Sequence, residues 1–407
     1  MTSADRNLLP GERLDWTARA DAVDDRTSDE AINDKYVRGE IRIVVEQARY
    51  PLKQVTDLVR SADYNLQPDF QRRPRWSRER QSRLIESFVV NVPVPPVFLY
   101  ESELSRYEVM DGRQRLTAIA EFYEDKFSLQ GLTQWPELNG RRYSQLPEQV
   151  RRGIDRRYLS SIILLHETAK STAEADRLKQ LVFERINSGG EDLSDQEKRN
   201  ALHPGAMNTL CVRLSRLPSF CAMWGIPEPD RTEFRGGENW TPPAELGDNE
   251  LYRTMGDVEL VLRFFAHRQR GRLWKSGALD EYLTRYLSDA NGFSRSTLRD
   301  LEEIFMKTAD LTYRVLGPDA FLLYRARKHG WLWVGRPTLV AYDPIMFAFS
   351  RLISVGDRLV EQAANICNAL PEFYQNNSAA FDGRKVNLSD VRVRDQLFFE
   401  FLEGFTE

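Results

Sequence analysis

The chain has 407 residues, of which 57 are basic and 61 acidic, giving a net charge of −4, and 41% are hydrophobic. This length allows two or three domains with buried cores, and the net charge argues against a protein built mainly to coat nucleic acid. The sequence has no apolar run near the roughly 20 residues of a membrane span and no apolar signal peptide, so we expect a cytoplasmic protein with no membrane partner.

The N-terminal part of the chain begins with a polar arm. Residues 1–36 carry nine acidic and five basic residues and show little periodicity, so we expect a mobile arm or a loosely docked extension. Residues 41–46 alternate as a strand, and residues 51–62 carry apolar side chains at helical spacing. A second helix is predicted from an N-cap at Ser77 to Asn91, with an apolar stripe opposite its arginines.

The next elements indicate a mixed α+β domain. Strands are predicted at residues 97–100 and 107–110, and apolar residues then recur at helical spacing from Leu116. An arginine-rich helix at residues 150–157 precedes another buried strand at residues 160–165. Strands and helices are therefore interleaved along this part of the chain.

The remainder of the chain is predicted to be mostly helical. A helix over residues 172–186 ends at Asn187 and two glycines, and Ser194 begins a capping box for the next helix. From about residue 206 onward, the apolar spacing is almost wholly helical. We therefore expect an α+β domain at residues 37–205 and a helical domain at residues 206–407.

A single cluster carries recognisable chemistry, where a predicted strand gives way to a helix. Its residues are Asp111, Gly112, Arg113, Gln114, Arg115, Leu116 and Thr117. A helix N-terminus exposes unpaired N–H groups and a partial positive charge, whereas cations there oppose the helix dipole unless an anion lies between them. We interpret Asp111 as a carboxylate that holds a divalent cation or orients a water, with Arg113 and Arg115 neutralising phosphates. The alternative is a capping Asp, with both arginines paired to acidic side chains.

The cluster resembles the DGQQR motif of the GmrSD-type N-terminal domain family, a bacterial group with a ParB/sulfiredoxin-like core found in many antiphage defence proteins. Arg113 stands where the family has Gln. Further segments match the same family in the same order, namely residues 68–73 with Trp76, residues 93–97, and residues 183–187 leading to residues 189–194. The resemblance covers roughly residues 40–205 and implies a ParB/sulfiredoxin-like core in the first domain.

The resemblance also implies site residues. In this family the DGQQR segment is implicated in nucleotide binding and hydrolysis or in nucleic-acid cleavage. These roles would fall on Asp111, Gln114 and Arg115 as catalytic residues, with Asp111 as the metal ligand. The expected phosphate- or nucleotide-binding residues are Gln71, Arg72, Arg73, Gly112, Arg113, Thr117 and Asn187. A role that needs a neutral amide at the third position is not carried over to Arg113.

The segment around Gln71 is locally basic. Residues 72–83 contain six arginines and one acidic residue, Glu79, so they could attract phosphates, or they could form a solvated helix face. Trp76 could stack on a base or anchor the core. Asn187 could contact a phosphate or a metal-bound water, or satisfy backbone groups of its own loop.

Other familiar sites are missing from the sequence. The three cysteines, Cys211, Cys221 and Cys367, are widely spaced, so we expect buried free thiols. The four histidines are isolated, which argues against a metal site built on histidine. The sequence has no GxxxxGK[ST] loop, and residues 206–407 lack the close histidine and asparagine pair of an HNH-like nuclease.

The leading hypothesis is a bacterial antiphage defence component that binds and hydrolyses a nucleoside triphosphate with Mg²⁺ or another divalent cation. It would sense or act on DNA, with a nuclease supplied by a partner defence protein. One alternative is a metal-dependent DNA nicking endonuclease that uses the same Asp111 site. Another is a non-catalytic ParB-like adaptor that binds DNA or protein. The sequence specifies no particular base for the nucleotide.

Overall fold

The computed structural model describes residues 8–14, 33, 45–66, 76–165, 178–179, 181–182, 185, 194–230, 233, 242–273, 279–328, 330–382 and 388–406. The chain divides into two compact units. We call Ala18–Leu193 the N-terminal unit, and Met1–Thr17 together with Ser194–Glu407 the C-terminal unit. Each unit is described separately below.

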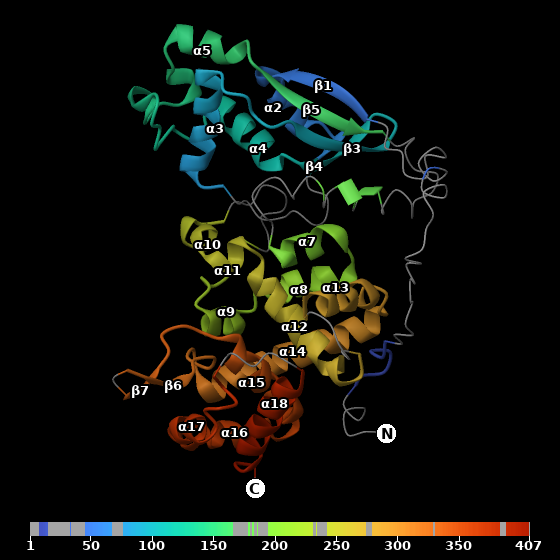
Figure 1. The fold of residues 1–407 in the computed structure, drawn as a ribbon, viewed down its shortest axis with the longest axis vertical. Coiled ribbons are helices and arrows are strands. Elements are labelled where there is room, and N and C mark those ends of the chain that lie inside the picture. Colours follow the sequence, from blue (N-terminus) through green and yellow to red (C-terminus); the bar gives the residue numbers. More distant parts are fainter. Residues whose placement is uncertain are drawn as a thin grey trace. The chain divides into compact units, whose positions relative to one another are not determined.

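A five-stranded sheet forms the centre of the N-terminal unit (Figure 1), with strand order β1-β5-β3-β4-β2. The strands are β1 (Val45–Pro51), β2 (Tyr64–Asn65), β3 (Val97–Glu103), β4 (Arg106–Asp111) and β5 (Tyr158–Leu164). The α-helices are α2 (Val55–Arg60), α3 (Arg78–Val90), α4 (Arg113–Tyr123) and α5 (Glu148–Asp155), and the 3-10 helices are η2 (Leu52–Gln54), η3 (Pro136–Leu138) and η4 (Tyr143–Gln145). Parallel and antiparallel neighbours are mixed, because β5 and β3 run parallel whereas β3 and β4 run antiparallel. The predicted α+β class is confirmed.

The two faces of this sheet have different coverings. Leu99 and Val109 point from neighbouring strands into the core that the helices complete, where Leu116 of α4 is also buried. Tyr100 and Glu108 are paired across β3 and β4, and alternation places them on the opposite face. There the Lys179 ammonium lies 2.8 Å from Glu108 Oε2 and 4.3 Å from the Tyr100 ring centre.

Local sequence signals set the ends of α3. The Ser77 hydroxyl accepts a hydrogen bond from the Arg80 N–H at 3.3 Å, which satisfies one of the free donors of the first turn. At the other end, Asn91 adopts the left-handed conformation with φ of 67°. The helix predicted between Ser77 and Asn91 is confirmed.

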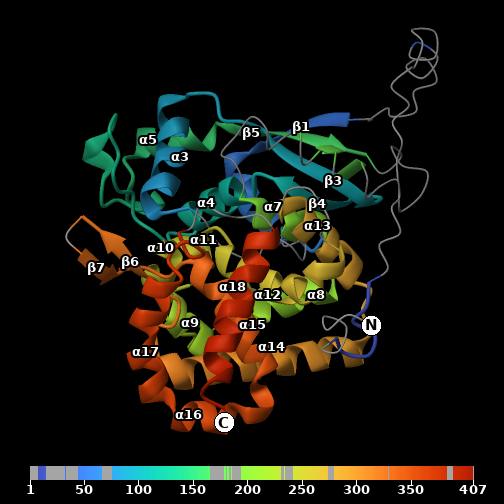
Figure 2. The same ribbon diagram turned by 60° about the horizontal axis from the view of Figure 1, so that its bottom comes forward.

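The C-terminal unit is mostly helical, as predicted. Its helices are α7 (Asp195–Leu202), α8 (Ala206–Leu214), α9 (Pro218–Trp224), α10 (Ala244–Asp248), α11 (Glu250–Arg253), α12 (Gly256–Leu273), α13 (Leu279–Ala290), α14 (Arg295–Leu316), α15 (Leu339–Arg351), η7 (Ile353–Val355), α16 (Gly356–Glu361), α17 (Ala363–Asn376) and α18 (Leu388–Glu403). In Figure 2, α15 lies beside α14 and α18, and these helices contribute the fully buried Phe305, Phe349 and Phe398 to one core. A two-stranded hairpin of β6 (Tyr324–Arg327) and β7 (Gly330–Trp333) interrupts the helical pattern and was not predicted.

Helix α7 belongs to the C-terminal unit, although the sequence places residues 194–205 in the first domain. Its Arg199 side chain is only 2% exposed. The guanidinium lies 2.5 Å from Glu259 of α12 and also pairs with Asp280 of α13. Because a buried cation needs such partners, this network attaches α7 to the helices that follow it in the chain.

The N-terminal residues 8–14 also pack in the C-terminal unit. Glu12 is fully buried, and its carboxylate accepts hydrogen bonds from Arg268 Nε at 2.7 Å and Arg268 Nη2 at 2.9 Å. The Gln269 side chain bonds to the Glu12 carbonyl on one side and to the Leu14 N–H on the other. The predicted polar arm therefore includes a docked segment, and the chain leaves the C-terminal unit after it and returns at Ser194.

The cysteine prediction holds for two of three positions. Cys211 and Cys221 are buried free thiols, and burial raises the pKa of Cys211 above its usual range. Cys367 is exposed instead, although its thiol donates to the Val315 carbonyl of α14 at 3.4 Å.

Within the described ranges, no single helix has the length and apolar character needed to cross a membrane. Among the described helices, Leu339–Arg351 followed by Ile353–Glu361, bent by 68°, passes that test as a pair. The first of these helices is α15, whose apolar side chains such as Ile345 and Phe349 are buried in the core of the C-terminal unit.

Candidate functional site

The predicted junction between strand and helix is present at Gly112. Strand β4 ends at Asp111, α4 begins at Arg113, and Gly112 between them has φ of 97°. A side chain is strained at this φ, and an added Cβ would also overlap Val97 Cγ1 and lie 2.8 Å from Val97 Cβ. The glycine therefore allows both the turn and the close approach of β3.

Arg115 is held by partners from within the domain. Its Nη2 lies 2.5 Å from Asp111 Oδ2 and donates to the Pro96 carbonyl at 3.2 Å. The Arg115 side chain is 14% exposed, whereas that of Asp111 is 34% exposed. The alternative in which the arginines pair with acidic side chains thus applies to Arg115. The Asp111 carboxylate nevertheless remains partly exposed to solvent.

Arg113 lacks the ion pair that Arg115 makes, although Arg115 Nε, like one Arg113 nitrogen, is buried without a hydrogen-bond partner among the described residues. It is partly buried, its Nη1 atom is fully buried, and that atom has no hydrogen-bond partner among the residues described. Burial lowers the pKa of Arg113 to about 10. The guanidinium remains charged at neutral pH, so an anion bound beside it would compensate for lost hydration.

Two further predicted residues lie on the first turns of α4. Gln114 and Thr117 are partly buried, and no hydrogen bond of either side chain is found within the described part of the chain. Thr117 follows Arg113 by one helical turn, so the two share one side of α4. Together with the N-terminal N–H groups of α4, they offer donors suited to a phosphate.

The sequence surrounding this junction matches a known protein family. Residues 55–204 match the sequence model described as GmrSD restriction endonuclease, N-terminal domain. The segment is a GmrSD-type N-terminal domain. This domain indicates a restriction or antiphage defence protein that acts on DNA. A search of curated proteins and a search of solved structures found no significant match.

The carboxylates of the GmrSD-type domain constrain how it could hold a metal ion. In the described ranges, no three His, Cys, Asp or Glu side chains gather as a metal site. Asp111 can contribute one oxygen ligand, since only its Oδ2 is engaged by Arg115. Mg²⁺ commonly takes one or two carboxylates and completes its shell with phosphate oxygens and water. Asp111 therefore fits a Mg²⁺ ion that accompanies a phosphate ligand.

Arginines of the basic segment at residues 72–83 make contacts within this domain, near the C-terminal end of α4. Arg78 Nη1 lies 2.6 Å from Glu121 Oε2, which links α3 to α4. The Arg80 guanidinium lies 4.9 Å from the centre of the Trp76 ring, and Trp76 also packs against the domain core. These contacts favour the role of Trp76 as a core anchor over base stacking.

Several predicted residues cannot be compared with the site. Gln71, Arg72, Arg73 and Asn187 lie outside the described residues. Conversely, the Pro96 carbonyl and the Val97 side chain are parts of the junction that were not predicted from the sequence. The proline run at residues 93–97 had been recognised as a family segment, but its contact with the GmrSD-type motif depends on the pairing of β3 with β4.

Proposed function

We propose that the Asp111–Arg115 junction binds the phosphates of a nucleoside triphosphate, and that hydrolysis of this nucleotide is coupled to the action of the protein on DNA. The observation that carries the proposal is the buried Nη1 of Arg113, which has no hydrogen-bond partner among the described residues. Its location in the first turn of α4 adds the positive end of the helix dipole. Arg115, by contrast, already has its anionic partner in Asp111.

Each residue of the Asp111–Arg115 junction would have a separate role in hydrolysis. Water attacks the γ-phosphorus, the bond to the β–γ bridging oxygen breaks, and nucleoside diphosphate and inorganic phosphate leave. Asp111 orients the water, and Arg115 fixes the Asp111 carboxylate through their ion pair. Arg113 and the helix N–H groups stabilise the charge on the phosphate oxygens, with Gln114 and Thr117 as hydrogen-bond donors. A divalent cation, when bound, would neutralise part of the phosphate charge, with Asp111 as one ligand.

The wider site in this proposal follows the family resemblance. Gln71, Arg72, Arg73 and Asn187 would supply additional phosphate contacts. DNA cleavage would come from a partner defence protein that the nucleotide state controls. The experiments below distinguish this proposal from two alternatives, which are DNA nicking at Asp111 itself and a non-catalytic adaptor role.

Replacing Arg113 with glutamine restores the family residue and should shift stability and binding in opposite directions. The lowered pKa of Arg113 shows that burial disfavours its charge, so we expect Arg113→Gln to raise the free energy of unfolding by about 1–2 kcal/mol. The same change should weaken triphosphate affinity by about tenfold, equivalent to about 1.4 kcal/mol. Urea unfolding and calorimetric titration with non-hydrolysable analogues measure the two effects. Unchanged affinity would remove Arg113 from the proposed site.

Turnover tests the catalytic part of the proposal. We expect phosphate release with Mg²⁺ from at least one of ATP, GTP, CTP and UTP, and a decrease of about tenfold or more in Asp111→Asn. Asp57→Asn, at an exposed position of α2, is the matched control and should retain wild-type turnover. Binding without turnover would support the adaptor alternative, and nucleotide-independent relaxation of supercoiled plasmid that is lost in Asp111→Asn would support the nickase alternative.

A further inference from the structure

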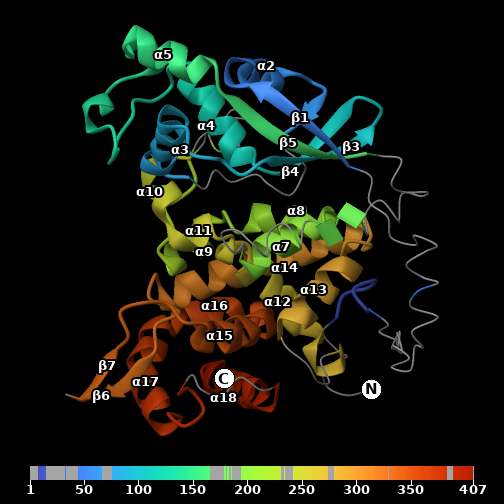
Figure 3. The same ribbon diagram turned by 45° about the horizontal axis from the view of Figure 1, so that its top comes forward.

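The β6–β7 hairpin projects from the helices of the C-terminal unit (Figures 1 and 3). Within the described residues it forms a sheet of its own with two strands, so each strand has one edge without a neighbouring strand. Residues 324–336 contain four Lys or Arg side chains and no acidic side chain, although the whole chain carries a net charge of −4. The hairpin is therefore a concentrated positive feature on a mildly acidic protein.

Aromatic contacts fix one face of this hairpin. Tyr324 stacks on Trp331 with ring centres 5.8 Å apart, and it lies 5.3 Å from Trp333. Trp333 in turn meets Tyr374 of α17 edge to face at 6.0 Å. Such pairs stabilise a two-stranded ribbon that would be weak by itself. The aromatic face is thereby held against α17.

The basic side chains occupy the other face and the turn. Alternation along β6 places Arg325 and Arg327 opposite Tyr324. Arg325 is engaged near the base of the hairpin, where it donates to the Asp382 carbonyl. Arg327 and Lys328 are exposed, as is Arg336 just after the hairpin, and none of the three forms an ion pair with any described residue. These three charges are available to a partner.

We propose that the β6–β7 hairpin binds duplex DNA, with Arg327, Lys328 and Arg336 contacting backbone phosphates. These three cations, which form no ion pair within the described part of the chain, complement a polyanion, and a two-stranded ribbon has dimensions that the major groove accepts. The aromatic contacts reduce the conformational entropy lost when the ribbon binds. The inference rests on the proposed function only for the choice of DNA as target, and it does not involve the phosphate site at Asp111.

The test is the salt dependence of duplex binding by the full chain. Fluorescence anisotropy with a labelled duplex at several KCl concentrations gives the slope of log K against log[salt]. We expect Arg327→Ala/Lys328→Ala to weaken binding and to reduce the magnitude of this slope by about 1.8, because each phosphate contact contributes about 0.9. Near-ultraviolet circular dichroism of the tryptophans checks that the hairpin remains folded.

Arg295→Ala/Arg299→Ala is a matched control, because it removes the same charge from two exposed positions. These positions lie at the start of α14, whose 22 residues span roughly 33 Å before the chain reaches the hairpin. The control should keep the wild-type slope. Equal slopes for both double variants, or no binding of duplex by the wild type at low salt, would overturn the proposal. Nucleotide turnover without DNA should be normal in both double variants. A failure of the DNA-binding proposal for the hairpin can therefore be distinguished from a failure of the proposed phosphate site at Asp111.

Discussion

Gly112→Ala is expected to destabilise the N-terminal unit by about 2–5 kcal/mol, through backbone strain and overpacking together. Alanine at φ of 97° is strained, and its Cβ would collide with the Val97 side chain. The added carbon would also lie 3.1 Å from Arg115 Nη2, the atom that joins Asp111 and Pro96. The change should therefore lower stability and nucleotide affinity together.

Gly140 provides a matched control for the backbone effect. It has a similar φ of 83°, but an added Cβ would have no atom within 4 Å. Gly140→Ala should therefore cost only about 1–2 kcal/mol, the strain of a left-handed residue. Urea unfolding of both variants measures the difference. Adding Val97→Ala to Gly112→Ala should recover part of the lost free energy of unfolding. Equal losses of this free energy in Gly112→Ala and Gly140→Ala would show that the contact with Val97 contributes nothing.

Elements with local end signals could be predicted from the sequence. Ser77 and Asn91 delimit α3, and the hydroxyl and carboxylate of Ser194 and Glu197 form the expected capping box at α7. Gly112 marks the change from strand to helix because glycine tolerates the φ of 97° there, whereas its close approach to Val97 could not be read from the sequence. Such signals operate within one turn of chain, so no tertiary information is required.

Features that depend on distant partners could not be predicted. Arg113 and Arg115 look equivalent in the sequence, yet only Arg115 gains the Pro96 carbonyl through the pairing of β3 with β4. The β6–β7 hairpin was missed because its arginines and lysine are also common in helices, and its stability depends on Tyr374 from another element. Tertiary contacts decide both cases, and a single sequence does not reveal which distant residues meet in the fold.

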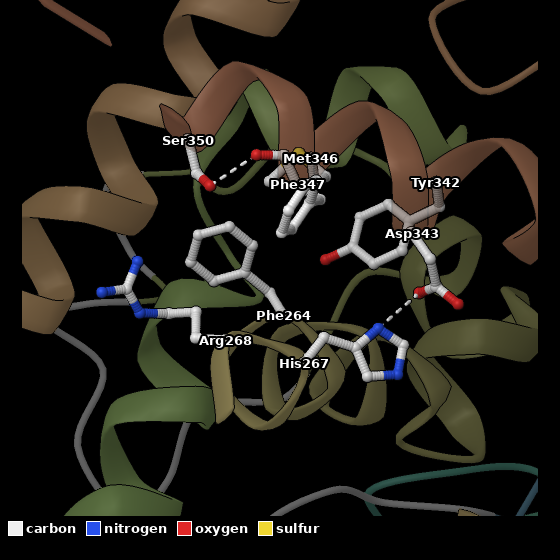
Figure 4. Close-up of a pocket in the computed structure, with 8 residues that line it drawn as sticks. All are labelled: Phe264, His267, Arg268, Tyr342, Asp343, Met346, Phe347 and Ser350. Atoms are coloured by element: carbon white, nitrogen blue, oxygen red, sulfur yellow. Dashed lines mark hydrogen bonds and ion pairs between the residues drawn. The ribbon is translucent and has the colours of Figure 1, made fainter. Parts of the chain in front are cut away.

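A buried charge cluster in the C-terminal unit carries the second large expected effect. Figure 4 shows a small pocket in which His267 of α12 faces Asp343 of α15. Arg263 Nη2 lies 2.5 Å from Asp343 Oδ2, and His267 Nδ1 lies 3.5 Å from Asp343 Oδ1. The Asp343 side chain is 5% exposed and that of Arg263 is 7% exposed. The pair joins α12 to α15 in the middle of the helical core.

Burial alone would lower the pKa of Arg263, but the charge and hydrogen bonds of Asp343 outweigh it and raise that pKa. A cation whose pKa is raised by folding contributes stability below its unfolded pKa, and this contribution is lost only as pH rises through the folded pKa. For an arginine that window lies far above neutrality. The Arg263 contribution should therefore be constant across neutral pH.

Asp343→Ala is consequently expected to lower the free energy of unfolding by about 3–5 kcal/mol, because it leaves Arg263 charged, buried and without its carboxylate. Asp195→Ala removes a carboxylate from an exposed pair with Lys198, and should change stability by less than about 0.5 kcal/mol. Urea unfolding compares the two. The double variant Arg263→Leu/Asp343→Leu should recover most of the loss, since the penalty arises from the unpaired charge. If the double variant is no more stable than Asp343→Ala, the core requires the ion pair itself, and the cost cannot be assigned to an uncompensated Arg263.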